Sequence, residues 1–375
     1  MIKVGITGNT GFIGSHLYNY LRLDDSIELI NFRKCFFDDG AKLKKFISNC
    51  DVIVHLAAMN RCHDGQTLYD VNIDLIKKLL DSMEALSSKP SILFSSSTQE
   101  KKDNRYGFSK KDGRLLFEDW SKNNNSSFIN MQIPNVYGPF CKPNYNSFIA
   151  TFSNQLIKGE MPEVIEDNRI DLIYVGSLCK IILDKIKSLD SRSKKIENEL
   201  IPPDYCSNVS TVLETLVKFK KLYIDKGIIP SLLTSNDINL FNTFRSYINL
   251  DSYFPVKLKI HSDKRGSFVE TIKLDMGGQI SFSTTVPNVT RGDHFHTRKI
   301  ERFIVIKGKA LIQLRKIGET KIYDFVLDGD TPSYIDMPVW YTHNIKNIGK
   351  QELLTKFWIN EFYNPNDSDT FFEKV

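Results

Sequence analysis

The stretch that most limits the possible folds of this chain lies at its start, where an apolar run is followed at once by regularly spaced glycines. The apolar run covers residues 2–7 and favours a short buried strand. Gly8, Gly11 and Gly14 follow it, and a pattern of helical periodicity comes next. Glycines in this context allow the backbone to approach a pyrophosphate at the helix N-terminus. The order strand, glycine turn, helix therefore predicts a parallel α/β domain that binds a dinucleotide.

The end of the second predicted strand indicates which dinucleotide to expect. This strand covers residues 27–32 and ends in Arg33 and Lys34. A carboxylate at this place would bind the ribose 2′-hydroxyl of NAD, whereas a basic side chain accommodates the 2′-phosphate of NADP. The basic pair therefore favours NADPH. The alternative is that both residues are solvated charges on a surface loop.

A serine, a tyrosine and a lysine follow at a spacing that can support proton transfer. Residues 91–97 predict a strand that ends in three serines, and Tyr106 and Lys110 come shortly after it. A tyrosine and a lysine four residues apart lie on one helix face, where the ammonium can lower the phenol pKa. We interpret Tyr106 and Lys110 as the proton-transfer pair. Ser97, with Thr98 as the nearest alternative, would steady the reacting oxygen.

Together these motifs resemble the extended short-chain dehydrogenase/reductases that act on nucleotide sugars, over residues 1 to about 245. The resemblance implies that Asn135, in a segment similar to the family's NxYGP motif, contacts the substrate. Gln132 stands where that family commonly has an arginine. The resemblance also implies that the cofactor is bound by the glycine turn, the stretch after His55 and the catalytic pair, namely Gly8, Gly11, Phe12, Ile13, Gly14, Leu56, Ala57, Ala58, Tyr106 and Lys110.

The second half of the chain contains metal-binding residue types within a pattern of short strands. His294 and His296 are two residues apart in a predicted strand, so their imidazoles point to the same face. Glu301 follows soon after, and His343 lies on a later strand. Three imidazoles and a carboxylate that converge inside a small β-barrel can hold a divalent metal, most simply zinc. The alternative is a metal-free barrel whose histidines bind substrate or transfer protons.

This spacing resembles the two-part motif of the cupin barrel, with Trp340 where cupins usually have glycine. The DxRGxFxE and RGxH signatures resemble those of the cupin-fold epimerases of dTDP-4-keto-6-deoxyhexoses. In that family the RGxH histidine, here His294, removes a proton beside a ketone, so His294 is a candidate both as catalytic base and as metal ligand. Phe303 replaces a lysine of that family. The implied substrate contacts are Arg265, Glu270, Gln279 and Arg291.

Length and composition agree with two soluble domains. A chain of 375 residues can form two cores, and its hydrophobic content of 41% and charged content of 25% are ordinary for a globular protein. We predict a Rossmann-type doubly wound parallel sheet over residues 1–246 and an all-β cupin (jelly-roll) barrel over residues 247–375. The net charge of +5 is small and scattered, which argues against a nucleic-acid partner. Six cysteines without a CxxC pair, an immediate first strand and no long apolar run favour a cytoplasmic protein without membrane contact.

From end to end the chain resembles the bifunctional capsular polysaccharide assembly enzymes of the CapF type. The resemblance implies C3 epimerisation of a UDP-4-keto-2-acetamido-2,6-dideoxy-L-hexose in the cupin, followed by NADPH reduction at C4 in the reductase. The product would be UDP-N-acetyl-6-deoxy-L-talosamine, a precursor of UDP-N-acetyl-L-fucosamine for capsule or O-antigen. We also expect a homodimer. The alternatives are a plain sugar reductase whose cupin is a binding or dimerisation module, and a regulator that binds NADPH without turnover.

Overall fold

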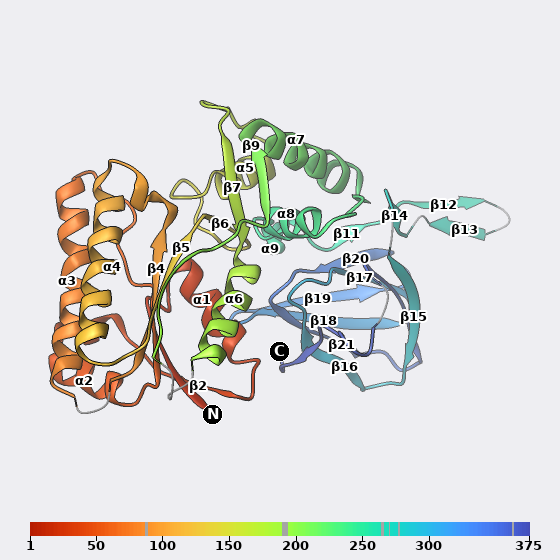
Figure 1. Ribbon diagram of the computed structural model, residues 1–375. Helices are drawn as coiled ribbons and strands as arrows, with labels where there is room; N and C mark the ends of the chain where they lie inside the picture. The colour runs from red at the N-terminus through yellow and green to blue at the C-terminus, as the bar shows by residue number, and fades with distance from the viewer. Residues whose placement is uncertain (87–88, 190–193, 264–265, 270, 277, 362–363) are drawn as a thin grey trace. The chain divides into compact units, whose positions relative to one another are not determined.

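The computed structural model describes residues 1–375 except 87–88, 190–193, 264–265, 270, 277 and 362–363, and for residues 260–263, 266–269 and 279 it describes the backbone alone (Figure 1). The chain divides into two compact units, residues 1–148 with 167–209 and residues 149–166 with 210–375. The boundary predicted between residues 246 and 247 thus lies within the second unit, and it stays a prediction of where one domain ends. Among the described residues, no helix is both long enough and apolar enough to span a membrane.

The first unit is built around a six-stranded sheet in which every neighbouring pair is parallel. Its central strands are short, and all four residues of one of them are buried, as expected for strands covered on both faces. In spatial order the strands are β2 (Ile27–Ile30), β1 (Ile2–Thr7), β3 (Val52–His55), β4 (Ser91–Ser97), β5 (Phe128–Ile133) and β8 (Ile196–Leu200).

Helices cover both faces of this sheet, and each face has its own hydrophobic core (Figure 1). One core contains residues of α1 (Phe12–Leu21) and α6 (Val175–Ser188). The other contains residues of α2 (Gly40–Ser48), α3 (Gly65–Glu84) and α4 (Arg105–Asn123). A small second sheet joins β6 (Asn135–Tyr137), β7 (Arg169–Tyr174) and β9 (Tyr205–Asn208). The unit is therefore doubly wound, and its carboxyl strand ends lead into the candidate active-site residues.

The second unit contains two five-stranded antiparallel sheets of a cupin-like domain. One consists of β11 (Val256–Lys257), β20 (Ser333–Met337), β17 (Glu301–Lys307), β22 (Leu353–Ile359) and β15 (Gln279–Thr285). The other consists of β19 (Ile322–Asp328), β18 (Lys309–Lys316), β21 (Tyr341–Asn347), β16 (Thr290–Phe295) and β23 (Phe371–Phe372). A parallel α/β sheet followed by antiparallel sheets confirms the predicted fold class.

Short helices complete the second unit, and one of them contacts a barrel strand through buried charge. These helices are α5 (Phe148–Ile157), α7 (Val209–Phe219), the π-helical turn η3 (Lys220–Ile224), α8 (Ser235–Arg245) and α9 (Leu250–Tyr253). On α8, Arg245 donates to the carbonyl of Met337 at the end of β20. On β17, Arg302 pairs with Asp336 through two hydrogen bonds of 2.7 and 3.0 Å. Arg302 and Asp336 are only 1% and 2% exposed, so this pair joins β17 to β20 in a dry place, and Arg302 also donates to the carbonyl of Gly227 after η3.

Breaking this pair should destabilise the second unit strongly. Arg302→Met removes one partner and leaves the Asp336 carboxylate uncompensated in a dry place, so we expect a loss of about 3–5 kcal/mol in the free energy of unfolding. Urea unfolding followed by tryptophan fluorescence in a Trp120→Phe background reports this unit, which then holds the remaining tryptophans, Trp340 and Trp358.

The matched control is Lys309→Met, since Lys309 forms an ion pair with Asp328 while being 62% exposed. Exposed pairs contribute about 0–1 kcal/mol, so this variant should be nearly neutral. Equal effects of the two substitutions would contradict the structural role given to Arg302.

Candidate active site and candidate metal centre

The glycine turn and the strand end after His55 lie against each other in the first unit. Gly8 has a φ of +74°, and a Cβ there would lie 2.8 Å from the backbone nitrogen of Ala57. A Cβ on Gly14 would lie 2.0 Å from the carbonyl oxygen of Gly8. Only glycine fits these two positions, and their tight turn leaves the N-terminus of α1 open for an anion. The structure thus brings together most of the predicted cofactor-binding residues, Gly8, Gly11, Phe12, Ile13, Gly14, Leu56, Ala57 and Ala58.

The basic pair lies next to the same turn. The amide of Asn9, inside the glycine turn, donates to the carbonyl of Phe32 at 3.1 Å. Arg33 and Lys34 follow directly and are exposed at the start of the 3₁₀ helix η1 (Lys34–Asp38). Their side chains are therefore available to a phosphate at the edge of the predicted cofactor site.

Ser97, Tyr106 and Lys110 all follow β4. Ser97 ends the strand and its hydroxyl accepts from the backbone N–H of Gln99. Tyr106 and Lys110 lie in the first two turns of α4, and the Lys110 ammonium is 5.6 Å from the centre of the Tyr106 ring. Burial raises the pKa of Tyr106 to about 12 and lowers that of Lys110 to about 8. Lys110 is held by the carbonyl of Ser95, at 2.7 Å.

Two further residues support this group, and sequence patterns did not indicate either role. Asn72, buried on α3, exchanges hydrogen bonds with the backbone of Met59 and donates to the hydroxyl of Ser109, which donates to the carbonyl of Tyr106. This chain of contacts fixes the first turn of α4 against α3. The only signal in the sequence is an amide at an otherwise apolar helix position.

Glu100 is the second such residue, a carboxylate buried behind Lys110. It accepts hydrogen bonds from Ser96 and Asn130, and it pairs with Arg114 at 3.0 Å. Its charge opposes the effect of burial on the pKa of Lys110 and so favours the ammonium form.

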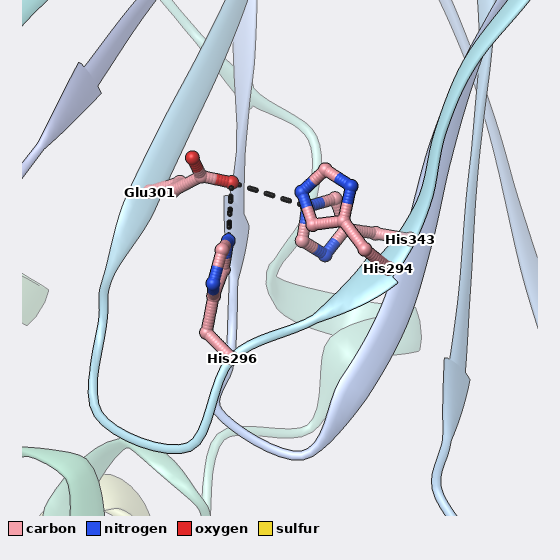
Figure 2. A group of neighbouring side chains, drawn as sticks. All are labelled: His294, His296, Glu301 and His343. Atoms are coloured by element: carbon pink, nitrogen blue, oxygen red, sulfur yellow. Dashed lines mark ion pairs between the residues drawn. The ribbon is translucent and has the colours of Figure 1, made fainter. Parts of the chain in front are cut away.

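In the second unit, the four predicted ligands come from both sheets and meet inside the barrel (Figure 2). His294 is the last residue but one of β16 and pairs in register with His343 on β21, while Glu301 begins β17 in the other sheet. The Glu301 carboxylate lies 3.3 Å from Nε2 of His296 and 3.1 Å from Nε2 of His343. One potential ligand atom from each of the four residues lies within 4.8 Å of the others. The structure therefore assembles the set predicted from the spacing.

The hydrogen bonds of two imidazoles show what this cluster is suited to hold. Nδ1 of His296 lies 2.5 Å from the carbonyl of Asp369, and Nδ1 of His343 lies 3.2 Å from the carbonyl of Tyr341. A carbonyl can only accept, so each Nδ1 carries the proton and each neutral ring turns its Nε2 lone pair towards Glu301. Lone pairs that face a carboxylate in a buried place require a cation between them, either a metal ion or added protons. The donor set therefore fits a divalent metal.

The pKa shifts within the cluster agree with a metal-binding role. Burial alone would raise the pKa of Glu301, but when protons occupy Nε2 of His296 and His343, their hydrogen bonds and positive charge hold the pKa of Glu301 well below its usual range. Burial and the neighbouring imidazoles lower the pKa of His294 to about 4. At neutral pH His294 therefore keeps a free lone pair, as a metal ligand or a base needs.

Trp340 shows why cupins usually have glycine at this position. Its φ is +61°, and its backbone N–H donates to the carbonyl of His296 at 2.8 Å. A left-handed backbone at a bulky residue costs on the order of 1–3 kcal/mol. The Trp340 ring is 5% exposed and stacks on Phe295 at 5.5 Å, so its burial offsets the strain. The turn at Trp340, which donates to the His296 carbonyl, thus keeps a glycine-like conformation.

The predicted substrate-binding residues do not form a described cluster as the predicted cofactor-binding residues and metal ligands do. Arg265 and Glu270 lie outside the described residues, and Gln279 is described by its backbone at the start of β15. Arg291 is exposed on β16 and donates to the carbonyl of Thr284. Asn135 is exposed on β6 and donates to the carbonyl of Asp171. Their roles stay predictions.

The fold and the two sites define a dinucleotide-binding enzyme domain joined to a cupin-like domain. Residues 4–197 match the NAD dependent epimerase/dehydratase family, and residues 261–371 match the polysaccharide biosynthesis C-terminal domain. The chain is 30% identical over 374 residues to the UDP-2-acetamido-2,6-beta-L-arabino-hexul-4-ose reductase of Pseudomonas aeruginosa, covering 99% of this chain and 98% of that protein. It is also 28% identical over 125 residues to the spore coat polysaccharide biosynthesis protein SpsL of Bacillus subtilis, covering 30% of this chain and 82% of that one.

Solved structures give the same result. The capsular polysaccharide assembling protein CapF from Staphylococcus aureus matches over 100% of both chains, with 30% identity and a TM-score of 0.63. RMD from Pseudomonas aeruginosa, solved with NADPH, matches 59% of this chain and 83% of its own with 18% identity and a TM-score of 0.52, which shows the fold alone. The chain belongs to the NAD dependent epimerase/dehydratase family, in the CapF-type arrangement with a polysaccharide biosynthesis C-terminal domain. This confirms the resemblance inferred from the motifs.

Exchanging the basic pair should change the cofactor preference. Arg33→Asp with Lys34→Ala should lower the ratio of NADPH to NADH affinity at least about tenfold, because each charge-assisted contact to a phosphate contributes roughly 1.5–3 kcal/mol. Titration of the purified protein with each cofactor, followed by fluorescence, measures this ratio.

The control is Lys44→Asp with Lys45→Ala, which makes the same charge change at two exposed positions of α2. It should leave the ratio nearly unchanged. A cofactor ratio equal in both double variants would mean that Arg33 and Lys34 are solvated charges.

Proposed function

We propose that this protein is a bifunctional nucleotide-sugar enzyme that epimerises a UDP-4-keto-2-acetamido-2,6-dideoxy-L-hexose at C3 and then reduces its C4 ketone with NADPH. The observation that carries the proposal is the presence, in one chain, of a Tyr106/Lys110 pair beside a dinucleotide turn and of a buried histidine–glutamate centre in a cupin-like domain. The full-length relative named as a UDP-acetamido-hexulose reductase supports the substrate class. The likeness to CapF supports a place in capsule or O-antigen synthesis.

In the proposed reduction, NADPH supplies the hydride to the carbonyl carbon and Tyr106 donates its phenolic proton to the oxygen. A phenol with a pKa of about 12 is a weak acid. The Lys110 ammonium, 5.6 Å from the centre of the Tyr106 ring, would stabilise the phenolate that remains. Ser97 lies at the end of β4, where its hydroxyl can donate to the same carbonyl oxygen. Arg33 and Lys34 would hold the 2′-phosphate of the cofactor.

In the proposed epimerisation, His294, His296, Glu301 and His343 would hold a divalent metal, most simply zinc. Such a metal would polarise a carbonyl and stabilise the negative charge on its oxygen while a base of the enzyme takes the neighbouring proton and a proton returns to the opposite face of that carbon. We place His294 among the ligands, because its ring centre lies 4.7 Å from that of His343 and 5.1 Å from that of His296. Arg291, with Arg265 and Gln279, would hold the nucleotide and sugar.

The order of the two steps follows from their chemistry. The C3 proton is acidic only while the neighbouring C4 is a ketone, so epimerisation has to precede reduction. The expected product is UDP-N-acetyl-6-deoxy-L-talosamine, a precursor of UDP-N-acetyl-L-fucosamine. A homodimer in the cytoplasm remains our expectation for the working form.

Metal content tests the cupin half of the proposal. The purified protein, supplied with zinc, should carry about one divalent metal per chain, and His296→Ala with His343→Ala should lose it because two of four ligands are removed. Elemental analysis after gel filtration measures the ratio.

The control is His63→Ala, at an exposed position of the first unit, which should keep the full metal content. Metal-free wild-type protein after zinc supply would overturn the metal site and return His294 to the role of base.

Isotope exchange separates the two activities in the intact chain. Tyr106→Phe should reduce the UDP-4-keto sugar more slowly by a factor on the order of 10² to 10⁴, the range for loss of a general acid. In heavy water the same variant should still place deuterium at C3, because the proton is removed in the other unit. NMR of the sugar follows both reactions.

A matched variant, Tyr106→Phe with His343→Ala, should show neither reduction nor exchange. If Tyr106→Phe leaves the sugar undeuterated after long incubation, the cupin is a binding or dimerisation module. If it keeps more than about a tenth of the reductase turnover, Tyr106 is not the proton donor.

A further inference from the structure

The last residues of the chain run along β16, the strand that carries His294 and leads into His296. β23 pairs with the end of β16, with Phe372 opposite His294 and Phe371 opposite Phe295. Further on, the backbone N–H of Glu373 donates to the carbonyl of Asp293 at 2.9 Å. The C-terminal segment is therefore an added edge strand on the ligand-bearing side of the sheet.

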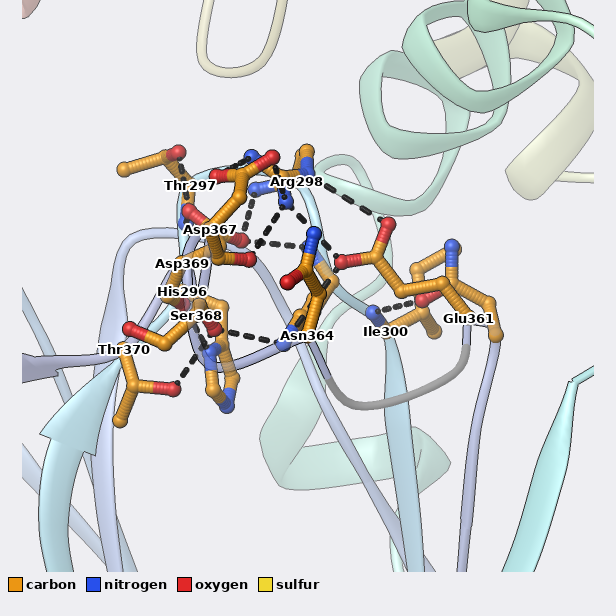
Figure 3. A network of polar contacts seen from close by, with 12 residues as sticks. His296, Thr297, Arg298, Ile300, Glu361, Asn364, Asp367, Ser368, Asp369 and Thr370 are labelled. Atoms are coloured by element: carbon orange, nitrogen blue, oxygen red, sulfur yellow. Dashed lines mark hydrogen bonds and ion pairs between the residues drawn. The ribbon is translucent and has the colours of Figure 1, made fainter.

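Within this segment, the Asp369 side chain contacts only the turn that follows His296, among the described residues (Figure 3). Its Oδ1 accepts from the backbone N–H of Thr297 at 3.1 Å and from the Thr297 hydroxyl at 2.6 Å. Its Oδ2 accepts from the backbone N–H groups of Arg298 and Lys299, both at 3.0 Å. Four donors converge on one carboxylate that is 5% exposed. Such charge-assisted contacts are stronger than neutral hydrogen bonds.

The backbone of Asp369 acts on His296 itself. Its carbonyl accepts from Nδ1 of His296 at 2.5 Å. Asp369 has a φ of +43°, a left-handed conformation that aspartate and asparagine tolerate better than most residues. The side chain anchors the turn while the carbonyl fixes the imidazole, so one residue sets both the place of His296 and its tautomer.

We propose that Asp369 is a positioning residue of the metal centre, which holds His296 with Nε2 directed at the metal. This inference rests on the proposed metal site. It adds to that site a residue that lies 73 positions after His296 in the sequence. A metal-binding imidazole needs its other ring nitrogen hydrogen-bonded, because that bond fixes the tautomer and the orientation of the ring. The final residues of the chain thereby become part of the site, although none of them is a ligand.

The test is Asp369→Asn in the full-length protein, which keeps the size of the side chain and tolerates the left-handed backbone. An amide presents N–H groups to two of the four donors, so the anchored turn should loosen while the fold remains. We expect metal affinity, measured by competition with a chromophoric chelator, to fall on the order of 10- to 100-fold. In the cobalt-loaded protein the visible absorption bands should also change, since they report ligand geometry.

Asp367→Asn is the matched control. Asp367 lies two residues earlier in the same segment, is 62% exposed and pairs with the side chain of Arg298. It should leave the chelator competition and the cobalt spectrum within about twofold of the wild type. A general effect of charge loss or of a loosened segment would appear in both variants, whereas a positioning role appears in Asp369→Asn alone.

Thr297→Val removes one of the four donors without changing shape and serves if Asp369→Asn fails to fold. It should weaken metal binding by about threefold, in the same direction. The positioning role would be overturned if Asp369→Asn had the metal affinity and the cobalt spectrum of the wild type. If Asp369→Asn does not fold, the same result in Thr297→Val would overturn it. Either result would leave the proposal of a metal site intact. Wild-type protein that binds no metal would overturn both proposals.

Discussion

The barrel depends on the burial of a carboxylate among three imidazoles. Moving Glu301 out of water is costly, and its contacts with His296 and His343 offset that cost only when positive charge is present. The four residues come from both sheets, so packing of one sheet against the other brings their ligand atoms together. A metal that binds the folded barrel and not the unfolded chain would stabilise that fold directly. Folding and metal binding are then one linked equilibrium.

The first unit also contains a buried charged group, the ammonium of Lys110. Burial lowers the pKa of Lys110 to about 8, and the carbonyl of Ser95 and the charge of Glu100 favour the ammonium form. In both units a backbone carbonyl fixes the functional group: Ser95 for Lys110, and Asp369 for His296. A carbonyl can only accept, so it selects the protonated nitrogen without introducing a competing charge. This explains how polar groups are oriented in places that exclude water.

The parts of both sites that sequence could predict are those governed by local geometry. Glycine spacing fixes a turn, four residues separate two groups on one helix face, and two residues separate groups on one strand face. These rules located Tyr106 and Lys110 and the pair His294 and His296. Asp369, by contrast, acts across 73 residues of sequence, and its role depends on where the segment after β22 returns. The periodicity of a sequence does not indicate such a long-range contact. For the same reason it does not indicate that Glu100 is buried near Lys110.

The helices α7 and α8 belong almost entirely to the second compact unit, together with the antiparallel sheets. α8 packs against the barrel sheet because Arg245 reaches the end of β20, and the neighbouring buried pair of Arg302 and Asp336 lies on the same sheet. On β17, Glu301 and Arg302 are adjacent, so their side chains leave opposite faces of the sheet. One face carries Glu301 of the candidate metal centre and the other carries the buried ion pair. The strand that carries the Glu301 carboxylate is thus held by polar contacts on both faces of the sheet.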